Sequence, residues 1–360
     1  MSDMMTCMPF GQLMDWVLQE KKGQDTVFGV HRPYTINADQ NLTIFERNLE
    51  TPVGPAAGPH TQLAQNIIAS YYAGARFFEL KTVQKMDGAE LSACVNKPCI
   101  LADDEGYNCE WSTELTVPDA MSEYIKAWFI LHVMAKEFNL GAQDGFQFNI
   151  SVGYDLEGIK GDKVNTFIDG MMEAKDTAVF QECKKWLLDN ADRFHNFTRE
   201  DIEAIPSNVC NSATISTLHG CPPQEIESIA NYLLTEKHLN TFVKCNPTLL
   251  GYDFARKTMD EMGYDYMVFG DFHFRDDLQY EDAVPMLTRL MKLSEELGLE
   301  FGVKITNTFP VDVTRNELPS EEMYMSGKSL FPLSISLAAK LSEEFAGKLR
   351  ISYSGGADYY

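Results

Sequence analysis

The chain has 360 residues, with 53 acidic and 30 basic side chains and a formal net charge of −23. This charge argues against a nucleic-acid binder, which needs a basic footprint, and against attachment to an anionic membrane surface. A hydrophobic fraction of 44% is enough for a packed core, and the length suits two ordinary domains or one large α/β barrel.

Several features indicate a cytoplasmic protein. No charged, then apolar, then small-residue pattern opens the chain, so no secretory signal is predicted. The most apolar stretch, residues 127–135, contains His132 and is too short to cross a bilayer. The eight cysteines are spread along the chain, unlike those of a disulfide-stapled secreted domain, and we expect them to be reduced.

Short apolar runs alternate with longer segments of helical spacing along the chain. Runs rich in β-branched and aromatic residues predict strands at residues 52–57, 77–83, 146–153, 213–218, 241–245, 266–269, 301–306 and 349–353. Amphipathic spacing predicts helices at residues 60–74, 119–139, 224–239, 252–262, 281–297 and 332–345. The alternation predicts parallel strands joined by crossover helices, in an open sheet or a closed barrel.

We expect the closed alternative, an α/β TIM (β/α)8 barrel. No Gly-x-Gly-x-x-Gly follows the first strand, and polar or glycine-rich residues follow several strands, where a barrel gathers its site. Residues 1–50 are predicted to be an N-terminal extension and residues 51–360 the barrel, with insertions near 86–118 and 155–209. Because the sequence stops just after an apolar run, we expect the barrel to be truncated at its C-terminus.

The first candidate site residues follow the early strands. The small residues of segment 51–59 allow a flat ligand to approach the backbone, or they form a tight turn. Lys81 and Thr82 end the second strand with a cation and a hydroxyl, although the lysine could equally be solvated. Asn149 offers an amide to the edge of a heterocycle, or caps a turn.

The later strands end in further polar groups. Cys221 lies between a strand and a helix, where the helix dipole can lower the pKa of a thiol, although a lone cysteine is usually a small buried hydrophobe. Lys244 and Lys304 lie at the ends of two other predicted strands. Gly355 and Gly356 can form a nest of N–H groups around a phosphate. Together these residues predict a site for a planar, phosphorylated ligand.

The order of these motifs resembles that of the FMN-binding barrels of dihydroorotate and dihydropyrimidine dehydrogenases. It is similar above all to the N-terminal barrel of the selenate reductase subunit family, a group of iron–sulfur flavoproteins. The resemblance is carried by TPVGPAAGPHTQ at 51–62, FELKTVQ at 78–84, CEWSTE at 109–114, STLHGCPPQ at 216–224, GVKITNTFPV at 302–311, MYMSGKSLFPL at 323–333 and ISYSGGAD at 351–358.

The resemblance implies that FMN lies across the mouth of a dihydroorotate-dehydrogenase-like barrel. The residues that it assigns to the cofactor are Ala56, Ala57, Lys81, Thr82, Asn149, Lys244, Lys304, Asn307, Thr308, Gly355 and Gly356. Lys244 and Lys304 compete for one cofactor role. Cys221 occupies the place of the thiol that transfers a proton in dihydropyrimidine dehydrogenases.

One departure concerns the substrate. The family segment Asn-Leu-Ser-Cys-Pro reads here Leu-His-Gly-Cys-Pro at 218–222, so an asparagine that faces substrate is missing and His219 is its candidate replacement. Family members are also much longer and carry iron–sulfur and NADPH/FAD modules, which the resemblance places outside this chain. Cys94, Cys99 and Cys109 are separated by four and nine residues, unlike ferredoxin ligands, so we expect no metal within the chain.

The sequence therefore predicts an FMN-dependent oxidoreductase segment. It would move electrons between a small heterocyclic or other substrate and an iron–sulfur/NADPH module, with Cys221 or His219 as the proton carrier. A second possibility is a non-catalytic scaffold for subunits of a molybdenum- or selenium-dependent hydroxylase system. A third is a lyase or aldolase barrel that uses Lys81, Lys244 or Lys304 to form a Schiff base.

Overall fold

The computed structural model describes residues 5–34, 42–102, 105–109, 115–217 and 219–357. The chain divides into two compact units, each built from several segments. The first unit consists of Met1–Gly88, Glu114–Ser151 and Lys160–Ser212, and the second consists of Ala89–Thr113, Val152–Ile159 and Ala213–Tyr360.

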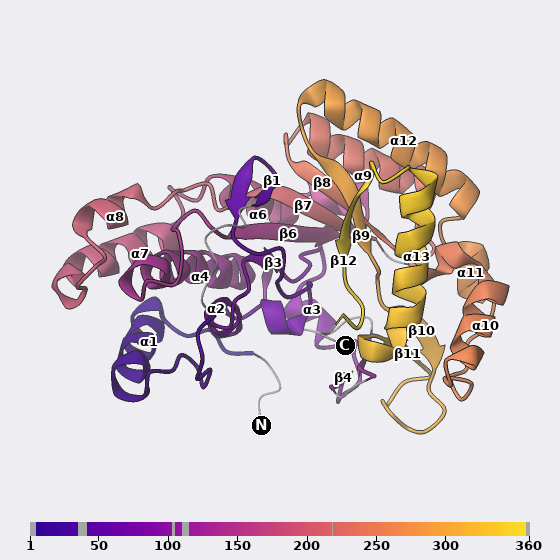
Figure 1. The fold of residues 1–360 in the computed structure, drawn as a ribbon, viewed down its shortest axis with the longest axis horizontal. Coiled ribbons are helices and arrows are strands. Elements are labelled where there is room, and N and C mark those ends of the chain that lie inside the picture. The colour runs from indigo at the N-terminus through magenta and orange to yellow at the C-terminus, as the bar shows by residue number, and fades with distance from the viewer. Residues whose placement is uncertain (1–4, 35–41, 103–104, 110–114, 218, 358–360) are drawn as a thin grey trace. The chain divides into compact units, whose positions relative to one another are not determined.

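The central sheet has six strands in the order β12-β9-β8-β7-β6-β3 (Figure 1). Their bounds are β3 Phe77–Glu79, β6 Gln147–Gly153, β7 Cys210–Ser216, β8 Asn240–Cys245, β9 Phe301–Ile305 and β12 Arg350–Tyr353. The pairs β3–β6, β8–β9 and β9–β12 are parallel. The six strands follow one another in this sheet in the same order as in the sequence, and helices connect them. This is the connectivity of a β/α barrel.

The first unit is mainly helical outside its strands. Its elements are α1 Phe10–Gln24, β1 Leu42–Ile44, β2 Arg47–Leu49, η1 Pro59–Thr61, α2 Ala64–Tyr72, α4 Val117–Glu137, α6 Asp162–Met172, α7 Ala178–Asp189, η2 Ala191–Arg193 and α8 Arg199–Ala204. Helix α4 packs against α2, α6 and α7. Thr116 caps its start, where the side chain accepts a 3.3 Å hydrogen bond from the Asp119 N–H.

Most of the remaining elements lie in the second unit. They are α3 Gly88–Leu91, β4 Ile100–Leu101, β5 Tyr107–Asn108, α5 Leu156–Lys160, α9 Pro223–Thr235, η3 Pro247–Leu250, α10 Tyr252–Glu261, α11 Phe272–Asp276, α12 Tyr280–Leu297, β10 Phe309–Asp312, β11 Glu322–Met325, η4 Gly327–Leu330 and α13 Phe331–Glu344. Strands β10, β11, β5 and β4 form an antiparallel sheet in that order.

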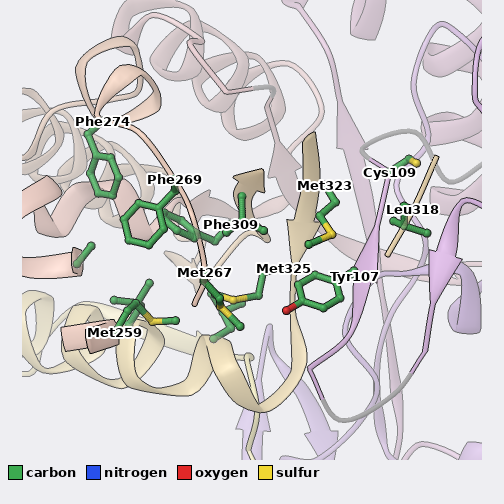
Figure 2. Packing of buried hydrophobic residues seen from close by; sticks show 14 residues of the cluster. Tyr107, Cys109, Met259, Met267, Phe269, Phe274, Phe309, Leu318, Met323 and Met325 are labelled. Atoms are coloured by element: carbon green, nitrogen blue, oxygen red, sulfur yellow. The ribbon is translucent and has the colours of Figure 1, made fainter. Parts of the chain in front are cut away.

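A core rich in methionine and phenylalanine joins this small sheet to α10 and α13 (Figure 2). The Phe269 and Phe309 rings meet edge to face with centroids 4.9 Å apart, and Met259, Met323 and Met325 are buried in the same cluster. Flexible thioethers fill the gaps that rigid rings leave. This core fixes the segment that follows β8, including α11, and so positions the residues discussed below.

Six of the eight predicted strands and all six predicted helices are present, with boundaries shifted by a few residues. Residues 52–57 do not form a strand. They nevertheless run beside β3, because Arg76 N donates to Val53 O at 2.9 Å and Glu79 N donates to Pro55 O at 3.2 Å. Pro52 and Pro55 have no N–H to donate in return, so a regular ladder cannot form.

Residues 266–269 are the second wrong strand prediction, because they form an irregular segment whose Met267 and Phe269 enter the core shown in Figure 2. Leu218 of the predicted strand 213–218, and residues 110–114 and 358 of the segments that carry the resemblance, lie outside the described residues. Among the helices that the structure describes, none is long and apolar enough to cross a membrane.

Candidate functional site

Two lysines occupy equivalent positions near the ends of neighbouring strands in the second unit. Lys244 of β8 is the parallel register partner of Lys304 of β9, and Ser352 of β12 continues the row. Register partners on strands about 4.8 Å apart direct their side chains to the same face. Lys304 is 2% exposed, and Lys244 is half-buried. The sequence left these lysines as competitors for one cofactor role, whereas the register brings both to one face.

The glycine pair after β12 lies close to the start of α13. Gly355 and Gly356 have φ values of 113° and 75°, which favour glycine. A side chain at residue 356 would also begin 2.7 Å from the carbonyl oxygen of Gly327. Ser334 of α13 lies against this loop, and its hydroxyl contacts the Thr306 hydroxyl at 2.9 Å. Backbone N–H groups in such a glycine turn can converge on an anion.

Asn307 and Thr308 form the loop after β9. Asn307 N donates to Cys245 O at 2.9 Å, and Thr308 N donates to the Asn307 side-chain oxygen at 3.1 Å. The Asn307 side chain therefore shapes its own loop as well as offering a polar edge. Both residues are half-buried at the same ends of β8 and β9 as the lysines.

The predicted residues of the first unit gather at the ends of β3 and β6. Thr82 Oγ1 lies 2.7 Å from Ser151 Oγ, and Leu80 N donates to Asn149 O at 2.9 Å. Lys81 is half-buried, and its carbonyl oxygen accepts a 3.1 Å hydrogen bond from Tyr124 Oη. These contacts place Thr82, Lys81 and Asn149 next to one another at this strand edge.

Ala56 and Ala57 lie in the segment that runs beside β3, and both are half-buried. Gly54, two residues earlier, allows this approach, because a Cβ there would overlap the Phe77 carbonyl oxygen. Small residues therefore bring this backbone against the sheet, as the close approach of a flat ligand would also require.

Several polar groups at the strand ends of the second unit bond to the carboxylate of Asp277, which follows α11 and whose side chain is 1% exposed. Its Oδ2 accepts from His219 Nδ1 at 2.7 Å, Thr248 Oγ1 at 2.7 Å and Asn246 Nδ2 at 3.0 Å. Its Oδ1 accepts from Gly220 N at 2.7 Å. Four donors from the ends of β7 and β8 thus converge on one carboxylate.

The charge state of Asp277 follows from these contacts. Burial on its own raises the pKa of a carboxyl group. Here the hydrogen bond and charge of His219, with the hydrogen bonds from Thr248 and Gly220, outweigh burial and lower the pKa of Asp277 below its ordinary value. The carboxylate is therefore ionised near neutral pH and accepts all four hydrogen bonds.

The expected acidification of Cys221 is wrong. Burial raises the pKa of this thiol to about 11, and the negative charges of Glu225, Asp155 and Asp277 add to the rise. A hydrogen bond with Thr217 lowers the pKa but does not offset them. The helix-dipole argument failed because it considered one element and left out three nearby carboxylates. The thiol stays protonated at neutral pH, so it can donate a proton but cannot readily accept one.

Sequence reasoning missed three members of the Asp277 cluster: Asn246, Thr248 and Asp277 itself. Asn246 and Thr248 follow β8 directly, and the same rule that selected the other strand-end residues could have found them. Asp277 gave no such signal, since it follows a short helix rather than a strand. Only the folded chain brings it to His219, 58 residues away.

The structure offers no preformed metal centre within the residues that it describes. No group of three or more His, Cys, Asp and Glu side chains is arranged there to hold an ion. Cys99 and Cys109 lie on the β4–β5 hairpin, where Cys109 N donates to Cys99 O at 2.9 Å, and Cys94 is exposed.

Comparison with known proteins identifies relatives across nearly the whole chain. The family model described as the N-terminal TIM-barrel domain of the oxidoreductase YgfK matches residues 28–360, which confirms the predicted fold class. YgfK of Escherichia coli (strain K12) is 47% identical over 371 residues, and YgfK of Escherichia coli O157:H7 gives the same values. The alignment covers 99% of this chain but only 36% of each relative.

Two similar solved structures have low sequence identity to this chain. Ligand-free DHODH from Eimeria tenella is 15% identical, with a TM-score of 0.49, over 97% of this chain and 83% of that one. The same enzyme with ferulenol is 15% identical, with a TM-score of 0.48, over 97% and 80% of the two chains. Values this low carry no information about substrate or cofactor.

Proposed function

The chain belongs to the family of N-terminal TIM-barrel domains of the oxidoreductase YgfK, and from this premise we propose that it is the FMN-binding segment of a larger oxidoreductase. Its substrate would be a small heterocyclic molecule bound at the strand ends. Bound FMN would supply the hydride and single-electron chemistry that side chains lack. The residues of this chain would bind and orient cofactor and substrate and move the accompanying proton.

The in-register pair of Lys244 and Lys304 is the observation that carries this proposal. Two ammonium groups on one face of adjacent strands concentrate positive charge there, which favours binding of an anionic ligand. The phosphorylated end of FMN is such a ligand. The glycine turn at 355–356 would supply N–H groups for a phosphate, and its lack of side chains lets the turn pack closely against Gly327 and Lys328.

Titration with FMN and with riboflavin separates the phosphate contribution from that of the ring. We expect FMN to bind at least about tenfold more tightly than riboflavin, because one charge-assisted hydrogen bond contributes about 1.5–3 kcal/mol. Quenching of flavin fluorescence by the purified chain measures both affinities. Equal affinities, or no binding of either flavin, would contradict the proposal.

A pair of lysine variants tests the site itself. Lys304→Met should weaken FMN and leave riboflavin unchanged, since it removes a charge but keeps the length of the side chain. Lys292→Met is the matched control, because this lysine of α12 is 78% exposed. If the two variants bind FMN equally, Lys304 does not contact the cofactor.

The onward path of electrons is part of the same proposal. The chain spans 36% of the length of its relatives, and we propose that an iron–sulfur and pyridine-nucleotide module elsewhere in the full protein exchanges electrons with this segment. The FMN-loaded chain alone should then be reduced by dithionite but not by NADPH, as measured by the loss of flavin absorbance. Direct reduction by NADPH would contradict the proposal that a separate module passes electrons to this segment.

A further inference from the structure

One nitrogen of His219 stands out among the polar atoms of the second unit. The ring is 8% exposed, and Nε2 is fully buried without a hydrogen-bond partner among the described residues. Leaving such a group without a hydrogen bond is unfavourable. Buried polar atoms are paired almost everywhere in folded proteins, so this exception beside the strand ends indicates a role.

The other nitrogen fixes what Nε2 can do. The ionised Asp277 carboxylate can only accept, so Nδ1 of His219 must donate the 2.7 Å hydrogen bond. The Asn246 amide nitrogen, 3.2 Å from Nδ1, bonds to Asp277 instead. In the neutral ring the proton therefore resides on Nδ1, and Nε2 presents a lone pair.

Asp277 is itself held firmly. Thr248, Asn246 and the Gly220 N–H bond the same carboxylate, so the acceptor cannot turn away from the imidazole without breaking several hydrogen bonds. This arrangement fixes both the tautomer and the orientation of the ring. It also provides a nearby negative charge if Nε2 takes up a proton.

The titratable groups around the ring are few. The Tyr324 ring of β11 lies 5.6 Å from the His219 ring, and the His273 ring of α11 lies 5.5 Å away. His273 is bonded through Nε2 to Glu322. On the β7 side Cys221 follows two residues later, and its thiol stays protonated at neutral pH. Asp277 is thus the one acidic group bonded directly to His219 among the described residues.

We propose that His219 is the proton-transfer residue of this site, with Nε2 as the atom that takes or gives the proton and Asp277 as the residue that positions it. The inference rests on the proposed function, because a hydride-transferring site must also balance a proton. Bound FMN would supply the acceptor for the hydride that a substrate C–H bond loses on oxidation. Nε2 of His219 would take the proton of the neighbouring N–H or C–H bond, so that a double bond forms in the substrate, and it would return that proton on reduction.

Histidine-selective ¹⁵N NMR of the flavin-free chain tests the proposal without a substrate. We expect the His219 signals, assigned by their loss in His219→Gln, to show a protonated Nδ1 and an unprotonated Nε2 at pH 8. A proton on Nε2 at pH 8, in a chain that remains folded, would overturn the proposal.

Two variants separate positioning from folding. Asp277→Asn should redistribute the His219 proton between the two ring nitrogens, whereas Glu322→Gln should change only the signals of His273. If Asp277→Asn does not fold, Thr248→Val can replace it. This variant removes one hydrogen bond that holds the Asp277 carboxylate, and it should give a smaller redistribution of the His219 proton. An unchanged tautomer in a folded Asp277→Asn would show that Asp277 does not position His219. Because no flavin is present, failure of the FMN titration leaves this result interpretable.

Discussion

Two pairs of histidine and carboxylate lie in the second unit, and they differ mainly in their surroundings. The His219–Asp277 pair is 8% and 1% exposed, with a separation of 2.7 Å, and three further donors bind its carboxylate. The His273–Glu322 pair has a similar separation of 2.6 Å but is 17% and 42% exposed. The two imidazole rings are 5.5 Å apart, so the same region contains both environments.

The comparison teaches that separation alone does not determine what such a pair contributes. Water competes for the Glu322 carboxylate and screens its charge, so this pair should contribute little to stability. Protein donors take the place of water around the Asp277 carboxylate, and each of them would lose its acceptor if the carboxylate were removed. A buried pair such as His219–Asp277 can hold one tautomer of an imidazole, whereas an exposed pair such as His273–Glu322 can exchange partners with solvent.

The largest effect should come from removing the two carboxylates. Asp277→Ala leaves the four donors without their acceptor and should lower the free energy of unfolding by about 3–5 kcal/mol. Glu322→Ala should cost less than about 1 kcal/mol. Urea denaturation followed by circular dichroism measures both. Similar losses in the two variants would mean that burial does not distinguish the pairs.

A smaller effect should come from single hydroxyl donors beside each pair. Thr248→Val removes the 2.7 Å hydrogen bond to Asp277 and should cost about 1.5–3 kcal/mol, the range for a hydrogen bond to a charged group. Ser320→Ala removes the 2.7 Å hydrogen bond to the Glu322 carbonyl, at an exposed turn, and should change stability by less than about 0.5 kcal/mol. The same denaturation experiment applies, and a loss confined to Ser320→Ala would reverse the comparison.

The contrast also bears on what the sequence could predict. The alternation of strands and helices was readable because each depends on local periodicity: the predicted strand 241–245 is β8, Asn240–Cys245. The strand prediction for residues 52–57 was wrong because the prolines in this segment have no N–H groups to donate to a ladder. The α1 helix, in the predicted extension, went unpredicted although its buried Phe10, Leu13, Met14 and Val17 have helical spacing.

Site residues were predictable where they immediately follow a strand. His219 was selected as a candidate in this way, and Lys244 and Lys304 were selected because they lie near strand ends, although only the register showed that the two lysines share a face. Asp277 is separated from β8 by a long connecting segment, and no periodic pattern in the sequence indicates that it lies at the site. The pKa of Cys221 was likewise beyond the sequence, because it depends on carboxylates that folding brings together. Long-range polar contacts are the part of a site that local patterns do not encode.

Acid should affect the buried pair in a defined direction. The pKa of Asp277 is lowered in the folded chain, so its contribution to stability is present above the ordinary value of 3.8 and is lost as pH falls through the lower folded value. Between about pH 5 and pH 3, wild type should therefore lose more stability than Asp277→Asn, which cannot titrate at this position. The urea midpoint across this range measures the difference, with Glu322→Gln as the matched control. Parallel acid profiles for wild type and Asp277→Asn would show that the carboxylate is not specially stabilised.

Salt should produce the smallest effect and act on the opposite pair. The Debye length falls from about 10 Å at 0.1 M salt to about 3 Å at 1 M, which screens exposed charges strongly and buried ones much less. A double-mutant cycle of His273→Gln with Glu322→Gln should give a coupling below about 1 kcal/mol at low salt, and 1 M NaCl should reduce it toward zero. The corresponding cycle of His219→Gln with Asp277→Asn should keep most of its coupling, because the carboxylate is enclosed by Gly220, Asn246 and Thr248 rather than by water. Equal sensitivity to salt would mean that solvent reaches Asp277 in solution, and the fixed tautomer inferred for His219 would then lose its physical basis.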